Sequence, residues 1–180
     1  TVKTTLPAYI KEAEVLMQLL KNIKIKDLQK MMNISLSLAE INKERFEKWT
    51  IKHTLENSIP AAFAYNGDVY QGLQVETLSN ENLSFAQDRL FVISGLYGIL
   101  RPLDLIMPYR LEMGIPLVNS KGKTLYHYWK QAINDFLIKH AKNTKSKVLM
   151  NLASVEYSKV IDIKQLNLRV ISPEFKEFKD

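Results

Sequence analysis

The stretch that decides the fold is LFVISGLYGILRPLD, residues 90–104. Its first four residues are apolar and predict a short buried strand that ends at Ser94 and Gly95. The glycines and prolines that follow predict one long loop over residues 95–123. Because this loop also carries many leucine and tyrosine side chains, we expect it to be ordered rather than disordered.

Helical patterns and further apolar strands flank this stretch on both sides. Strands are expected at residues 61–65, 90–93, 147–152 and 169–172, and helices at 5–19, 26–32, 36–49, 69–73, 85–89, 124–141 and from 154. The sequence therefore predicts a mixed α/β (α+β) fold in one domain, residues 1–180. Its helical front end is residues 1–50, and its mixed α/β core is residues 61–180, with short strands alternating with helices around a small mixed sheet.

The composition excludes several classes of protein. Apolar residues make up 46% of the 180 residues, and cysteine is absent. No apolar run reaches the roughly 20 residues that a membrane span needs, and no leader peptide is recognisable. The lack of cysteine removes disulfides, cysteine-ligated metals and thiol peroxide chemistry. We expect a soluble, cytoplasmic globular protein with no membrane partner.

The charge is unevenly spread along the chain. The net charge is +6, made up of +3 in residues 1–60, −3 in residues 61–120 and +6 in residues 121–180. Such a balance is compatible with a polyanionic partner, because basic side chains that neutralise phosphates release counterions. The alternative is a solvated, lysine-rich surface with no such partner.

A first candidate site is LQKMMNISLSLAEI, residues 28–41, which resembles a helix-hairpin-helix. In that element the amides of the turn and the dipole of the second helix hold a DNA phosphate without reading sequence. Asn and Ser replace the two usual glycines, and both residues suit such a turn. An ordinary helical hairpin is the alternative. The candidate residues for contact with double-stranded or distorted DNA are Lys26, Lys30, Asn33, Ile34, Ser35, Ser37 and Lys43.

A second candidate site is a cleft beyond the ends of the strands at residues 90–93 and 147–152. We expect both strands to end at one edge of a sheet, where α/β proteins bind ligands. The candidate residues there are Ser94, Gly95, Arg101, Arg110, Asn151, Ser154 and Glu156. The alternatives are that Arg101 pairs with Asp104 or Glu112 to fix the loop, and that Ser154 only caps a helix.

This cleft also supports an alternative function, a hydrolase or transferase that acts on a phosphorylated small molecule. Arg101 and Arg110 would then bind the anion, and Glu156 would act as the base. The sequence gives no catalytic motif, and His53, His127 and His140 are too isolated to form a metal site. We therefore assign no catalytic residue, no metal ligand and no cofactor.

Three motifs carry a resemblance to a known family. They are FVISGLYGILRPLDLIMPYRLEMG (91–114), NGDVYQGL (66–73) and NLASVEY (151–157). Together they resemble the YaaA peroxide stress-response family. The resemblance implies a bacterial, cytoplasmic DNA-binding protein with a family-specific mixed α/β fold, a helix-hairpin-helix and a basic cleft. It also implies protection from peroxide by keeping unincorporated iron low. The family's Ser-Pro-Ala-Lys opening strand and basic C-terminal stretch have no counterpart here, so we expect an incomplete member.

Overall fold

The structure, a computed structural model, describes residues 3–174. Three helices come first, α1 (Ile10–Lys21), α2 (Ile25–Met32) and α3 (Leu36–Lys48). The middle of the chain forms β1 (Ile59–Pro60), α4 (Ala61–Ala64), α5 (Asp68–Leu73), the 3-10 helix η1 (Val75–Thr77), α6 (Asn80–Gln87), β2 (Val92–Ser94), β3 (Gly98–Leu100) and β4 (Leu105–Ile106). The rest forms α7 (Leu125–Thr144), β5 (Val148–Met150), α8 (Val155–Ser158), α9 (Ile163–Leu166) and β6 (Arg169–Ile171). The predicted mixed α/β class is confirmed.

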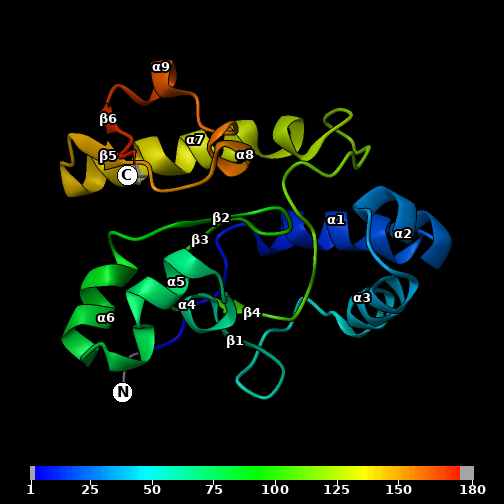
Figure 1. Cartoon of the computed structure of the whole chain (residues 1–180). Coiled ribbons are helices and arrows are strands. Elements are labelled where there is room, and N and C mark those ends of the chain that lie inside the picture. The colour runs from blue at the N-terminus through cyan, green and yellow to red at the C-terminus, as the bar shows by residue number, and fades with distance from the viewer. Residues whose placement is uncertain (1–2, 175–180) are drawn as a thin grey trace, which may run out of the picture.

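The elements gather in three groups around the β2–β3 hairpin (Figure 1). Helices α1, α2 and α3 lie together at one end, and α4, α5 and α6 lie at the other. Helix α7 and the C-terminal elements lie along one side of the hairpin. The buried apolar side chains form one cluster that runs from Leu16 in α1 through Ile99 in β3 and Trp129 in α7 to Leu166 in α9.

The strands do not form the one small mixed sheet that the sequence predicts. Within residues 3–174 there are three two-stranded sheets, which pair β1 with β4, β2 with β3, and β5 with β6. The first two pairs are antiparallel and the third is parallel. Each strand is only two or three residues long. Because β2 and β5 lie in different sheets, the shared sheet edge predicted for the second candidate site is wrong.

The β2–β3 hairpin is held against α7 by a close packing contact. Gly98 has φ +73°, and a Cβ at this position would lie 2.6 Å from Cε3 of Trp129. The indole Nε1 of Trp129 donates a hydrogen bond of 2.8 Å to the carbonyl of Gly95. Only glycine combines this backbone conformation with this approach to the indole ring. The hairpin is thereby fixed relative to the longest helix.

Two local predictions at the start of elements are wrong. Residues 61–65 are not a strand, because α4 begins at Ala61, directly after β1. A short apolar run does not distinguish a strand from a buried helix, and the alanines favour the helix. The first helix begins at Ile10, not near Thr5. Thr5 instead forms a β-bridge to Asp104, with its amide 2.9 Å from the carbonyl oxygen of Leu103.

Other elements lie close to their predicted positions. The long helix, the strands near residues 148 and 169 and the short helix after Ser154 all form. Helix α6 begins earlier than expected, because Ser79 rather than Ser84 is its N-cap. The Ser79 hydroxyl accepts a hydrogen bond of 3.1 Å from the amide of Asn82. Both serines suit a helix start, and the sequence pattern alone does not separate them.

Candidate functional site

Helices α2 and α3 form a hairpin with a tight turn at the predicted place. Asn33 adopts the left-handed conformation, with φ 50° and ψ 52°. The amide of Ile34 donates a hydrogen bond of 3.2 Å to the carbonyl of Gln29, which closes the end of α2. Ser35 caps α3, and its hydroxyl accepts a hydrogen bond of 3.3 Å from the amide of Leu38. Asn and Ser therefore build the turn without glycine.

The tip of this hairpin is at the surface. Asn33, Ser35, Ser37, Lys26 and Lys30 are exposed. Ile34 is half-buried and packs against the core, which anchors the turn. Within residues 3–174, the amides of Ser35, Leu36 and Ser37 have no hydrogen-bond acceptor, as is usual in the first turn of a helix. The hairpin therefore presents free donors and a positive helix end to solvent.

Lys43, which the sequence places beside the hairpin as a DNA contact, has a structural role instead. Its Nζ donates a hydrogen bond to the carbonyl of Lys21 at the end of α1 and lies 3.0 Å from Oε1 of Glu47. Lys21 in turn donates to the carbonyl of Trp49, at 3.0 Å. These contacts join α1 to α3. By contrast, Lys26 and Lys30 have no acidic partner in the described part of the chain.

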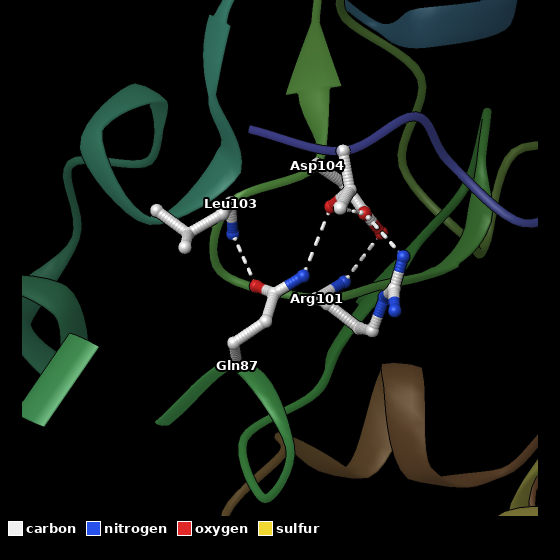
Figure 2. A network of polar contacts seen from close by, with 5 residues as sticks. Gln87, Arg101, Leu103 and Asp104 are labelled. Carbon is white, nitrogen blue, oxygen red and sulfur yellow. Dashed lines mark hydrogen bonds and ion pairs between the residues drawn. The ribbon is translucent and has the colours of Figure 1, made fainter. Parts of the chain in front are cut away.

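Arg101 fixes the central loop, which is the alternative that the sequence left open. Its Nη2 lies 3.1 Å from Oδ1 of Asp104, and its amide donates to Oδ2 at 2.8 Å. The Asp104 carboxylate is buried and also accepts a hydrogen bond of 2.6 Å from the Thr5 hydroxyl. Gln87 joins the network, because its Nε2 donates to Thr5 and its Oε1 accepts from the amide of Leu103 (Figure 2). The charge of Arg101 is thus neutralised within the fold.

The other residues of the predicted cleft also have partners nearby. Arg110 pairs with Glu112, with Nη2 2.6 Å from Oε1. Glu156 accepts a hydrogen bond of 2.8 Å from the amide of Gly114. Gly95 packs closely, since a Cβ there would lie 2.2 Å from the Leu111 carbonyl oxygen. These contacts do bring α8 and residues 111–114 up to the end of β2, but they leave Arg101 in the separate Asp104 network.

Asn151 and Ser154 make no hydrogen bond to these groups within residues 3–174. The Asn151 side chain turns back on its own strand pair, with Nδ2 3.3 Å from the Ser172 hydroxyl and Oδ1 accepting from the amide of Ala153 at 3.1 Å. Ser154 occupies the N-cap position of α8, but its side chain makes no capping hydrogen bond. Within residues 3–174, no hydrogen bond or ion pair joins any two of the seven predicted cleft residues, and the cleft stays a prediction.

A chain of three hydroxyl groups begins at Ser94, which is buried and which sequence reasoning assigned to the cleft, and continues to Tyr109 and Tyr65, which are half-buried. The Ser94 Oγ lies 2.5 Å from the Tyr109 Oη, which lies 2.7 Å from the Tyr65 Oη. Ser94 also accepts a hydrogen bond of 3.0 Å from the amide of Tyr97. Burial is the main cause that raises the pKa of Tyr65 and of Tyr109 well above the ordinary phenol range. Both phenols are therefore neutral at physiological pH.

A second polar centre that the sequence did not reveal surrounds the hydroxyl of Tyr97. The indole Nε1 of Trp49 donates to it at 2.9 Å, and the amide of Met107 donates at 3.1 Å. These two N–H groups cannot accept a hydrogen bond from the Tyr97 hydroxyl. The hydroxyl therefore donates its hydrogen bond to the third partner, Nε2 of His53, at 2.9 Å. His53 therefore carries its own proton on Nδ1. These four residues are called the Tyr97 centre below.

Burial sets the protonation of the Tyr97 centre. It raises the pKa of Tyr97 to about 12, and the hydrogen bonds from Trp49 and Met107 only partly offset this shift. Burial also lowers the pKa of His53, against the opposing effect of the carbonyls of Ile51 and Thr50. The Nδ1 of His53 has no partner of good hydrogen-bond geometry among the described residues. At neutral pH the pair is therefore a phenol beside a neutral imidazole.

Two shallow hollows open at the surface, away from the predicted cleft. One, of about 250 Å³, is lined by Ala62, Tyr65, Asn66, Tyr70, Gln71, Gln74, Val75 and Glu76. The other, of about 350 Å³, is lined by Arg45, Lys48, Asn57, Met107 and Pro108. Of the residues that the sequence assigned to either site, none lines these two hollows. The first hollow reaches the Ser94–Tyr109–Tyr65 chain through Tyr65.

Two further searches cover the described residues. Between residues 3 and 174, no three His, Asp or Glu side chains gather so that they would hold a metal ion. Over the same range, every helix is too short or too polar to cross a membrane.

Comparison with known proteins assigns the chain to a family. The family described as "Peroxide stress protein YaaA" matches residues 1–180. The chain therefore belongs to this family of peroxide stress proteins, which confirms the resemblance seen in the three motifs and places its function in the response to peroxide.

Its relatives include bacterial proteins named UPF0246. A relative from Saccharophagus degradans is 46% identical over 179 residues, which cover 99% of this chain and 70% of the relative. One from Polynucleobacter necessarius is 47% identical over 176 residues, covering 98% of this chain and 68% of the relative. One from Bordetella pertussis is 45% identical over 176 residues, with the same coverage.

Proposed function

We propose that the α2–α3 hairpin binds the phosphate backbone of double-stranded or distorted DNA without reading its sequence. The observation that carries this proposal is the exposed tip, where free amides and unpaired lysines meet. A phosphate at the start of α3 would accept hydrogen bonds from the amides of Leu36 and Ser37 and would benefit from the positive end of the helix dipole. Because the turn is already ordered, binding would lose little further conformational entropy in presenting these donors.

The positive charge of the hairpin also favours binding to the DNA backbone. Lys30 lies in the last turn of α2, beside residues 33–35, and Lys26 lies one helical turn earlier. Both are exposed and have no acidic partner in the described chain. Each phosphate that they neutralise would release condensed counterions, so binding would weaken steeply with salt. Lys43 takes no part, because it holds α1 against α3. The proposed contact set is therefore Lys26, Lys30 and the turn at residues 33–37.

In the cell, this contact would serve the response to peroxide. The resemblance of the three motifs implies that the family limits unincorporated iron, the metal that converts peroxide into damaging radicals. A protein bound along DNA would act where such damage matters most. The role in iron limitation is part of the proposal and is tested in cells, by measuring chelatable iron in a deletion strain complemented with the variants below.

The test is a salt titration of DNA binding with a charge-matched control. Lys26→Glu/Lys30→Glu is compared with Lys139→Glu/Lys142→Glu, which reverses two exposed lysines on α7. Fluorescence anisotropy of a labelled duplex is measured across a range of salt. We expect the hairpin variant to lower the salt slope by about 2, one for each lost phosphate contact, and the control to lower it far less. Equal slopes in both variants would refute the proposed hairpin contact.

A further inference from the structure

A continuous path of aromatic side chains crosses the molecule from the first hollow to the Tyr97 centre. Tyr70 and Tyr65 line the hollow and stack, with ring centroids 5.2 Å apart and an interplanar angle of 23°. The Tyr65 hydroxyl is hydrogen-bonded to that of Tyr109. The Tyr109 and Tyr97 rings meet edge to face at 5.4 Å. Tyr97 then contacts His53, with ring centroids 5.8 Å apart.

The two ends of this path differ in their surroundings. Tyr70 and Tyr65 are half-buried at the hollow, where a dissolved oxidant can reach them. Tyr97 is completely buried, and His53 and Trp49 beside it are nearly so. An oxidised side chain at the buried end is therefore shielded from water and from other molecules. Electron transfer by short steps requires neighbouring side chains in contact, and the side chains along this path meet that requirement.

The Tyr97 centre supplies what a tyrosine needs in order to be oxidised in a dry interior. Loss of an electron makes a phenol strongly acidic, and burial disfavours the resulting cation. The proton must therefore leave with the electron. The neutral Nε2 of His53, 2.9 Å from the Tyr97 hydroxyl, is within range to accept it. Burial lowers the pKa of His53, and the carbonyls of Ile51 and Thr50 only partly offset that effect, so His53 holds the proton for as long as the Tyr97 radical lasts.

We propose that Tyr97 and His53 form a redox-active pair that stores an oxidising equivalent delivered from the surface through Tyr65 and Tyr109. The oxidant is a one-electron oxidant such as the hydroxyl radical formed from peroxide and ferrous iron. This activity goes beyond the proposed DNA contact and does not depend on it. It belongs to the same response to peroxide as the rest of the family.

The electrons and protons balance at each step. The hydroxyl radical takes a hydrogen atom from the Tyr65 hydroxyl and becomes water, leaving a neutral tyrosyl radical. Tyr65 then takes a hydrogen atom from Tyr109 across their hydrogen bond. Tyr97 gives an electron to the Tyr109 radical and its proton to His53. The Tyr109 phenolate so formed lies 2.5 Å from the Ser94 hydroxyl and 2.7 Å from that of Tyr65, both of which can donate to it.

The cycle closes with a dissolved one-electron reductant. A thiol of small molecular weight supplies one electron to the Tyr97 radical and its proton to the Tyr109 phenolate, and the proton on His53 returns to Tyr97. The reductant must come from solution, because the chain has no cysteine of its own. The net reaction converts one hydroxyl radical and one thiol into water and one thiyl radical.

The test is photo-oxidation of the full chain, with photogenerated tris(bipyridine)ruthenium(III) as the one-electron oxidant. Radicals are followed by absorption and by freeze-quenched electron paramagnetic resonance, which separate tyrosyl from tryptophanyl species. The key variant is His53→Gln, because the amide oxygen still accepts the Tyr97 hydrogen bond but does not accept its proton. We expect formation of the persistent tyrosyl radical to slow by about a hundred-fold in this variant.

Two further variants make the result decisive. Tyr65→Phe keeps the stack with Tyr70 but removes the oxidisable hydroxyl, so we expect the persistent radical to be lost. Tyr126→Phe is the matched control, because Tyr126 donates to the carbonyl of Glu156, away from the path. We expect it to behave as the unmodified chain does. A persistent radical of unchanged yield and rate in both His53→Gln and Tyr65→Phe, with native circular dichroism, would overturn the proposal.

Discussion

Replacing Leu36 with proline tests the proposed DNA contact at the level of a single amide. Leu36 is the first residue of α3, and its amide has no acceptor in the described chain. Proline is favoured at this helical position, since its missing N–H is one that the helix does not use. The preceding residue, Ser35, has φ −64° and ψ 159°, a conformation that a following proline accepts. The fold should therefore be preserved.

The magnitude follows from the lost donor. A hydrogen bond to a charged group contributes about 1.5–3 kcal/mol, and exposure at the tip favours the lower end of that range. We therefore expect Leu36→Pro to weaken DNA binding by about ten-fold. The charge of the protein is unchanged, so the salt slope of binding should stay the same. This combination distinguishes an amide contact from a lysine contact.

The assay is the anisotropy titration, with Leu36→Ala as the matched control. Alanine removes the same side chain but keeps the amide, so Leu36→Ala should bind DNA as the unmodified chain does. Thermal unfolding followed by circular dichroism checks that both variants keep their helices. If the two variants bind DNA equally well, the amides at the start of α3 do not hold a phosphate.

Three further predictions concern the fold and its pH dependence. Gly98→Ala should lower the free energy of unfolding by about 2–4 kcal/mol in urea titrations, because the new Cβ meets the Trp129 ring at a positive φ; no loss would show that Trp129 moves freely. Gln87→Ala should lower it by about 1–3 kcal/mol, since Gln87 joins Thr5 to the amide of Leu103, whereas Gln131→Ala, on the exposed face of α7, should be neutral. Burial lowers the pKa of His53 below 6.5, so the unfolded chain takes up this proton at higher pH than the folded chain. The free energy of unfolding should therefore decrease as pH falls through 6.5 toward the folded pKa, and His53→Gln should remove this part of the slope.

Local structure was largely predictable from the sequence. The helical spacing of apolar residues predicts α7, and the residues at 33–35 predict the turn of the α2–α3 hairpin, because each depends on neighbours along the chain. The left-handed conformation of Asn33 and the N-cap at Ser35 likewise depend on residues nearby in the sequence. The failure at residues 61–65 comes from a short apolar run that fits a strand or a buried helix equally well, and the failure at Thr5 comes from a long-range contact. Thr5 is drawn into a bridge with Asp104, a partner 99 residues away, which no local pattern reveals.

The candidate site was less predictable, because its geometry depends on which partner each polar group finds. Arg101 and Arg110 resemble an anion site in the sequence, but each has a carboxylate three or two residues away that neutralises it. Conversely, Trp49, His53, Tyr97 and Met107 have no common spacing, and only the fold brings them around one hydroxyl. The sequence shows these four residues, but it does not show that they contact one another in the fold.

Helix α3 runs from the proposed DNA contact to the Tyr97 centre and holds the two sites apart. It spans 13 residues, so about 20 Å separate the Ser35 cap at its start from Trp49 at its end. Trp49 is the residue that donates to Tyr97. Sites this far apart with no shared partner contribute independently to measured free energies. Leu36→Pro should therefore weaken DNA binding without changing the tyrosyl radical, and His53→Gln should do the reverse. In the double variant each defect should equal that of the single variant. A defect larger than in the single variant would mean that α3 transmits a conformational change between the DNA contact and the Tyr97 centre.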